Sequence, residues 1–118
     1  MSRLTNYLRT HRRTWQLTQE ELALLFGYLD QSMVGRLERD ERVVTLAVAH
    51  TCHILFSVDP KEIFPAVFAG VEENLYRLLC DLRGQLLQQL PTRVTSHKLE
   101  LVHEAIHRLS VLSNQKGA

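Results

Sequence analysis

The chain has 118 residues and a formal net charge of +1; 45% of its residues are hydrophobic and 23% are charged. This length allows one domain, or one small domain with an appendage, and the balance is ordinary for a soluble globular protein. A net charge so close to zero does not by itself indicate a nucleic-acid binder. Helix formers such as Leu, Glu, Gln and Arg dominate while Pro and Gly are few, so the composition predicts an all-α fold.

The sequence has no feature typical of a membrane or secreted protein. No apolar run approaches the roughly 18 residues that span a bilayer, so we expect no membrane partner. Residues 1–13 contain no apolar segment of the kind found in secretory signals. Cys52 and Cys80 fall inside apolar helical patterns, which favours buried free thiols over a disulfide. We therefore expect a cytoplasmic protein.

The first helix is expected over residues 2–13. Trp15 follows in the connector, where its expected role is packing in the core or covering the helix junction. The stretch before Glu20 contains four arginines and no acid, so positive charge is concentrated here despite the neutral total. The apolar side of this first helix would consist of Leu4, Tyr7, Leu8 and His11.

Residues 17–40 read as two short helices around a tight turn. Thr18 begins the first, and Glu21 three residues later completes a capping box. Gly27 ends it, because glycine tolerates the positive φ found after many helices. Asp30 is placed to cap the second, whose apolar positions are Met33, Val34 and Leu37. Two short helices joined in this way have helix-turn-helix geometry.

Two further short helices should complete this domain. Thr45 can begin a helix over residues 46–55, and Asp59 followed by Pro60 is a strong start for a second one. Ile63 and Phe64 should close the core, and Pro65 should end the short helix. The inner positions expected on the helix over residues 46–55 are Leu46, Ala49, Cys52, His53 and Leu55.

The remaining sequence predicts two amphipathic helices. A leucine-rich stripe predicts one over about residues 68–90, Pro91 breaks it, and Thr95 or Ser96 can cap a last helix. Such helices could pack back on their own domain or pair with a second copy of the chain. The richness of the stripe favours pairing, so we expect dimerisation. The residues expected to mediate it are Leu75, Leu79, Leu82, Leu86, Leu99, Val102, Ile106 and Leu109.

Several of these motifs together resemble the Cro/C1-type (Xre) helix-turn-helix family. The resemblance rests on TQEELA at 18–23, Gly27, VGRLER at 34–39 and LFSVDPKEIFP at 55–65, and covers roughly residues 3–65. It implies a five-helix DNA-binding domain over 1–66, and the leucine-rich stripe predicts that a two-helix dimerisation element follows over 67–118. Asp40 stands where the family usually has glycine, a conformation that Asp can also adopt. Gly35 stands where a polar reading residue is common, so that position is either silent or one where the backbone approaches DNA.

The resemblance also implies roles for individual residues. The second helix of the motif would enter the major groove, where arginine can read guanine and glutamine can read adenine. Arg12 and Glu38 would form a structural ion pair between the first helix and this recognition helix. The base-contacting residues would be Gln31, Ser32, Gly35 and Arg36. The phosphate-contacting residues would be Thr18, Gln19, Arg9, Arg13, Arg39 and Arg42.

The expected function is therefore sequence-specific binding of double-stranded DNA by a homodimeric transcriptional regulator. A repressor that reads an inverted-repeat operator is the form that family analogy favours. The alternative is a protein-interaction module, an antitoxin or antiactivator, that binds a protein partner through its C-terminal helices. No cofactor is implied by either interpretation.

One motif points toward an enzyme instead. His103 and His107 form H-E-x-x-H, the zinc-protease pattern, with Glu104 between them. A catalytic zinc needs a third protein ligand, and the eleven residues after His107 contain no His, Cys, Asp or Glu. We therefore expect no metal site and no enzymatic activity.

Overall fold

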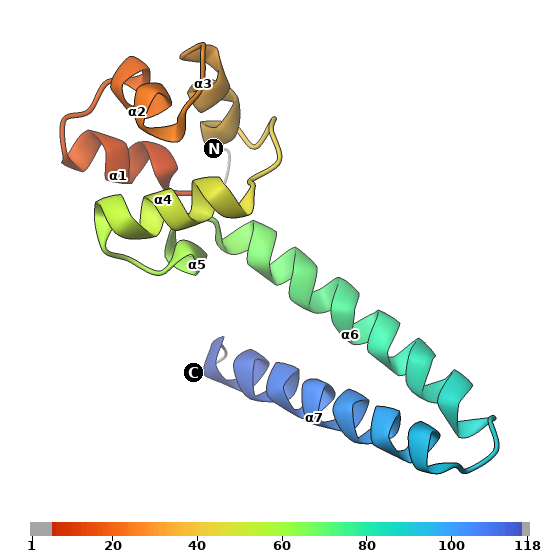
Figure 1. The fold of residues 1–118 in the computed structure, drawn as a ribbon. Coiled ribbons are helices and arrows are strands. Elements are labelled where there is room, and N and C mark those ends of the chain that lie inside the picture. Colours follow the sequence, from red (N-terminus) through yellow and green to blue (C-terminus); the bar gives the residue numbers. More distant parts are fainter. Residues whose placement is uncertain (1–5, 117–118) are drawn as a thin grey trace. The chain divides into compact units, whose positions relative to one another are not determined.

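The computed structural model describes residues 6–116, and this part of the chain contains seven helices and no strand (Figure 1). The predicted all-α fold is confirmed. The chain divides into two compact units, residues 1–69 and residues 70–118. The helices are α1 (Leu8–Thr14), α2 (Gln19–Phe26), α3 (Ser32–Glu38), α4 (Leu46–Phe56), α5 (Pro60–Ile63), α6 (Pro65–Leu87) and α7 (Arg93–Lys116).

Helices α1 to α5 enclose the core of the first unit. Fully burying a Leu, Ile or Phe side chain contributes about 1.5–3 kcal/mol, so this cluster holds the five short helices together. Ile63 and Phe64 are fully buried, which confirms their predicted place in the core. The cluster consists of Leu8, Leu22, Ala23, Val34, Leu37, Val48, Cys52, Phe56, Ile63 and Phe64.

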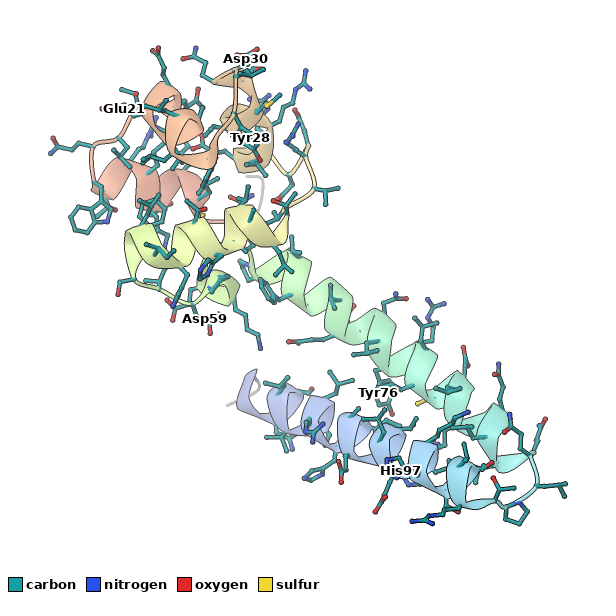
Figure 2. The ribbon with its side chains drawn as sticks, in the orientation of Figure 1. Glu21, Tyr28, Asp30, Asp59, Tyr76 and His97 are labelled. Carbon is teal, nitrogen blue, oxygen red and sulfur yellow. The ribbon has the colours of Figure 1, made fainter. Side chains whose placement is uncertain are left out.

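The capping motifs form as the sequence predicts. Thr18 Oγ1 accepts a hydrogen bond from the Glu21 amide at 3.0 Å, and the Glu21 carboxylate accepts one from the Thr18 amide at 2.9 Å. Gly27 follows α2 with φ of 77°. The carboxylate of Asp30 accepts from the Ser32 amide at 3.0 Å, and Asp59 caps α5 in the same way through the Lys61 amide at 2.9 Å (Figure 2).

The predicted start of the first helix is wrong. The helix begins at Leu8, and Asn6 and Tyr7 lie before it in non-helical conformation, while residues 2–5, including Leu4, lie outside the described residues. The side chain of Asn6 bonds to the Leu8 amide instead of allowing the helix to extend. A short polar side chain can compete with helix formation in this way. Trp15 is exposed and does not join the core.

The inner face of α4 also differs from the prediction. Val48, Cys52 and Phe56 are buried, whereas Leu46 is 87% exposed and His53 is exposed. The sequence of α4, LAVAHTCHILF, is apolar almost all round, so its periodicity does not identify the buried side. The helices that pack against α4 determine which of its sides is buried.

Two helix boundaries fall elsewhere than expected. Pro65 begins α6 rather than only ending α5, since a first-turn proline loses no helical hydrogen bond. Helix α6 also ends at Leu87, earlier than predicted. Helix α7 begins at Arg93, because Thr92 Oγ1 accepts from the Thr95 amide at 3.1 Å. Thr95, a predicted cap, is buried within the helix instead.

In the second unit, α6 and α7 run antiparallel and are joined by residues 88–92 (Figure 1). The hairpin itself covers much of the stripe that we assigned to dimerisation. Leu86 and Val102 are buried, and Leu79, Leu99, Ile106 and Leu109 are half-buried within one chain. Only Leu75 and Leu82 of that set remain more than 40% exposed.

Among the described residues, three other than glycine follow helices in the left-handed region: Gln16 with φ of 59°, Asp40 with φ of 59° and Ser57 with φ of 56°. This conformation costs a residue with a Cβ about 1–2 kcal/mol. We expect Ser57→Gly to raise the free energy of unfolding by about 0.5–1 kcal/mol after the entropy cost of glycine is included. Urea denaturation followed by circular dichroism measures this change.

Asp40→Gly is the matched control for that substitution. It relieves the same backbone strain but removes the 2.7 Å hydrogen bond that Asp40 accepts from Asn6. We expect this variant to gain less than Ser57→Gly or to lose stability. A larger gain at Asp40 than at Ser57 would contradict the structural role given to this bond.

Candidate nucleic-acid interface

The carboxylate of Glu38, at the end of α3, joins three segments of the first unit. Arg12 of α1 donates to it through Nε at 2.7 Å and through Nη2 at 3.4 Å. Gln19, at the start of α2, donates through Nε2 at 3.0 Å. Arg12 also donates from Nη1 to the carbonyl of Leu17 at 2.8 Å. The structure thus brings together Arg12 and Glu38 as an ion pair.

This ion pair is shielded from solvent, with 10% of the Arg12 side chain and 5% of the Glu38 side chain exposed. A buried charge is costly unless it is paired and its remaining hydrogen-bonding capacity is used. Here Gln19 and the Leu17 carbonyl supply those further bonds. The network therefore fixes the direction of α3 relative to α1 and the start of α2.

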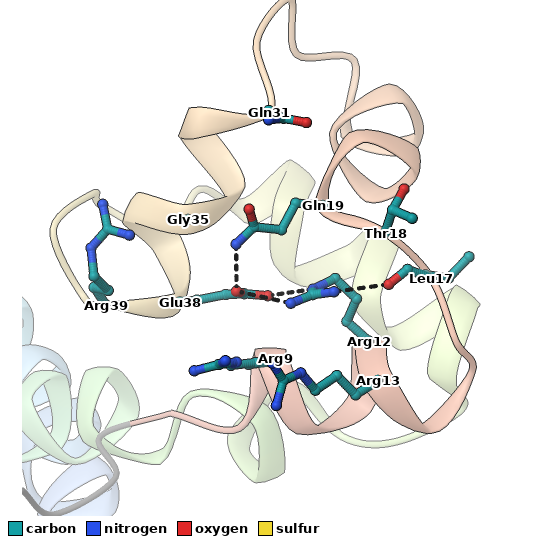
Figure 3. Close-up of a pocket in the computed structure, with 10 residues that line it drawn as sticks. All are labelled: Arg9, Arg12, Arg13, Leu17, Thr18, Gln19, Gln31, Gly35, Glu38 and Arg39. Carbon is teal, nitrogen blue, oxygen red and sulfur yellow. Dashed lines mark hydrogen bonds and ion pairs between the residues drawn. The ribbon is translucent and has the colours of Figure 1, made fainter.

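Above this network lies an open cleft of about 630 Å³ (Figure 3). Figure 3 shows the hydrogen bonds of Arg12 and Gln19 converging on Glu38 within it. The cleft contains four arginines and a single acid, whose charge Arg12 already neutralises. Its lining consists of Arg9, Arg12, Arg13, Leu17, Thr18, Gln19, Gln31, Gly35, Glu38 and Arg39.

The remaining arginines give the cleft its positive character. Arg9 and Arg13 are exposed on α1, and within residues 6–116 neither forms an ion pair. Arg39 pairs with Glu41 at 3.1 Å, and both side chains are more than half exposed. The hydrogen bond to Arg39 lowers the pKa of Glu41. An exposed pair of this kind is weak, so an incoming anion can compete for Arg39.

Gly35 lies beneath Arg39 and Gln19 and is buried. A Cβ atom built at Gly35 would lie 3.2 Å from Arg39 Nη1 and 3.6 Å from Gln19 Nε2. The missing side chain therefore provides the space in which the Arg39 guanidinium rests. Gly35 was expected among the base-contacting positions, but its surface is occupied by these two side chains.

The start of α3 presents its polar side chains to solvent. Gln31, Ser32 and Arg36 are all exposed, and Gln31 also lines the cleft. The hydrogen bond from the Ser32 backbone amide lowers the pKa of Asp30, with a smaller contribution from Arg36. A charged Asp30 beside the first turn stabilises the helix N-terminus from which these side chains project.

Arg42 does not line the cleft, unlike the other predicted phosphate-contacting residues. Its guanidinium carbon lies 4.9 Å from the centroid of the Tyr28 ring, a cation–π contact. Arg42 is half-buried, and it borders a separate hollow formed by residues 40–44 with Ala66 and Val67. Its position favours a structural role.

Asn6 is a positioning residue that we did not identify from the sequence. Its Nδ2 donates to the Leu37 carbonyl at 2.9 Å and to Asp40 Oδ1 at 2.7 Å, so it holds the end of α3. Its Oδ1 accepts from the Leu8 amide at 3.1 Å. An asparagine directly before an apolar helical run is a cap-type signal, and our prediction of a helix over residues 2–13 concealed it.

The histidines and cysteines of residues 6–116 are the other candidate functional groups. No cluster of three or more His, Cys, Asp or Glu side chains there has an arrangement that could hold a metal ion. His103 and His107 are both exposed on α7. Burial raises the pKa of Cys52 to about 12, so this thiol is unreactive at neutral pH. None of these helices combines the length and apolarity needed to cross a membrane.

The chain was compared with known protein families, curated proteins and solved structures. No family model, no curated protein and no solved structure matches the chain.

We expect Glu38→Ala to lower the free energy of unfolding of the first unit by about 3–5 kcal/mol, because it leaves the buried Arg12 unpaired. Replacing both residues, Arg12→Met with Glu38→Met, should cost much less than Arg12→Met alone or Glu38→Met alone. Urea denaturation of these two single variants and the double variant measures this coupling.

Glu41→Ala is the control, because it breaks the exposed pair with Arg39 and should leave the unfolding midpoint unchanged. If Glu38→Ala is no more harmful than Glu41→Ala, the network does not hold α1 and α3 together.

Proposed function

We propose that the protein binds double-stranded DNA in a sequence-specific manner and regulates transcription, as a homodimeric repressor that reads an inverted-repeat operator. The observation that carries this proposal is the arginine-lined cleft beside the exposed first turn of α3. Both features lie in the part of the chain that resembles Cro/C1-type (Xre) regulators. The resemblance supplies the direction of the proposal, and the geometry of the cleft supports it.

Phosphate binding is the first part of the proposal. Arg9, Arg13 and Arg39 direct positive charge into one open cleft, while its only acid is neutralised by Arg12. Thr18 and Gln19 line the same cleft and can donate to a phosphate oxygen. Such contacts would fix the position of the backbone and make affinity depend on salt. Arg42, which packs on Tyr28, is left out of the proposed contacts.

Base recognition is the second part. Gln31, Ser32 and Arg36 project from the exposed side of α3, on the element that would enter the major groove. Arginine can donate to guanine O6 and N7 together, and glutamine can pair with adenine N6 and N7. Gly35 is covered by Arg39 and Gln19, so we assign it the role of making room rather than contacting a base.

A protein-interaction module is the second candidate. The observation that favours it is the set of exposed apolar side chains on α6 and α7, which could receive a protein partner. The two candidates differ in a direct measurement. Salt-dependent affinity for duplex DNA supports the first, whereas one-to-one co-purification with a protein and no DNA affinity supports the second.

We expect Arg36→Ala to relax base preference and Arg39→Ala to weaken all duplexes alike. Loss of a bidentate guanine contact should cost about 1–3 kcal/mol at one base pair per half-site. Loss of a phosphate contact should lower the slope of log affinity against log salt by about 1 and preserve the preference. Titration of both variants against selected and scrambled duplexes at several salt concentrations measures these effects.

The two variants control for each other, since each removes one arginine from α3 or its C-terminal end. The assignment fails if Arg36→Ala keeps the parent's ratio of selected to scrambled affinity while Arg39→Ala loses it. If the parent protein does not distinguish any duplex selected from random sequences, the proposal of specific DNA binding is wrong.

A further inference from the structure

Helix α6 has a second apolar stripe that the hairpin does not cover. Val71, Leu75, Leu78 and Leu82 recur at helical spacing and are 42–60% exposed. At 3.6 residues per turn they share one side of the helix. Their mean direction is rotated by roughly 50° from that of buried Leu86, which faces α7. Helix α6 therefore has more apolar surface than one neighbouring helix requires.

Helix α7 has a similar second stripe. Val94 and Leu101 are both 62% exposed, and Ala105 and Leu112 continue the same row with partial exposure. This row is rotated by roughly 80° from the side that carries buried Val102. The rotation has the same sense as in α6. Viewed along each helix from its N-terminus to its C-terminus, the stripe lies counterclockwise of the buried side.

These two stripes lie on the same side of the hairpin. Both helices are right-handed, and they run antiparallel, so rotations of the same sense away from their shared contact bring both stripes to one face. We call this set, residues 71, 75, 78 and 82 of α6 with 94, 101, 105 and 112 of α7, the hairpin face. The opposite side of α7 is polar and carries Ser96, His103, His107 and Ser110.

The size of the hairpin face suits a second two-helix layer. It is about 20 Å wide and roughly 20 Å long, from helix diameters and the rise per residue. Pairing two such faces would remove on the order of 1,000 Å² from water, the lower bound for a specific interface. An exposed apolar patch of this kind marks an interaction site more often than a free surface.

The charges at its rim favour a second copy over a strongly charged partner. Asp81 borders the face on α6, and Arg108, which pairs with Glu104 at 3.5 Å, borders it on α7. Both signs are therefore present on one surface. A two-fold axis places the same patch against itself, so Asp81 of one copy can meet Arg108 of the other. Nucleic acid or a highly basic peptide would meet no such complement.

We propose that the hairpin face binds the hairpin face of a second copy of this chain, and that the two hairpins form a four-helix bundle. Facing apolar stripes on antiparallel helix pairs are the usual core of such bundles. The inference extends the homodimer of the proposed function by naming the surface that forms it. It does not depend on DNA binding.

The test is the oligomeric state of the full chain, measured by sedimentation equilibrium without DNA. We expect the parent protein to be a dimer and Leu78→Glu or Leu101→Glu to weaken dimerisation at least 100-fold. Each substitution places a carboxylate twice in a two-fold apolar interface. Helix content measured by circular dichroism should stay at the parent's value, because both side chains are exposed in the single chain.

Leu87→Glu is the matched control. Leu87 is also on α6 and is 64% exposed, but it lies outside the hairpin face, so this variant should remain dimeric. A monomeric parent, dimeric Leu78→Glu and Leu101→Glu variants, or equal dissociation by Leu87→Glu would each overturn the inference. If the hairpin face instead packs on its own chain, the parent is monomeric and Leu78→Glu loses stability.

The outcome also separates this inference from the proposed function. If the parent binds no duplex but the face variants dissociate the dimer, the DNA-binding proposal fails and the interface stands. If the parent binds an operator but stays dimeric in every face variant, the DNA-binding proposal stands and the interface lies elsewhere.

Discussion

The carboxylate of Glu38 is the point on which the geometry of the first unit depends. It is removed from solvent and must be compensated, and Arg12 and Gln19 do this from two different elements. Because Arg12 also binds the Leu17 carbonyl, the connector before α2 is fixed as well. One buried charge thus sets the positions of α1, α2 and α3, and with them the shape of the cleft above.

The same network determines how the cleft can interact with an anion. An unpaired Glu38 carboxylate would repel a phosphate, but its charge is neutralised by Arg12. Arg9, Arg13 and Arg39 are left to give the cleft its sign. Gly35 allows Arg39 to lie close to α3, since any side chain there would meet its guanidinium. Positive charge is therefore held at the cleft, although the whole chain is nearly neutral.

The second unit is governed by a different constraint, which is surplus apolar surface. A hairpin of two helices needs one apolar side on each helix, and the sides carrying Leu86 and Val102 meet that need. The additional stripe beginning at Val71 on α6 and the one beginning at Val94 on α7 exceed it. This excess apolar surface is the physical reason to expect a partner. Part of it consists of residues that we did not assign to dimerisation from the sequence.

The sequence by itself determined the features that depend on near neighbours in the chain. The all-α class, the Thr18 capping box, the Gly27 turn and the Asp59 cap follow from short-range hydrogen bonding and backbone preference. The leucine-rich periodicity likewise predicted both long helices, although not their boundaries. Most of the predicted phosphate-contacting residues do line one cleft, and Arg12 does meet Glu38.

Tertiary structure decided what depends on distant packing. Other helices determine which side of the nearly all-apolar α4 is buried and where Asn6 directs its amide. The space above Gly35 is filled by the side chains of Arg39 and Gln19. The sequence likewise does not show which leucines pack between α6 and α7 and which lie on the hairpin face. A periodic pattern records that a side is apolar, but only the placement of the neighbouring helix shows which part of that side is already covered.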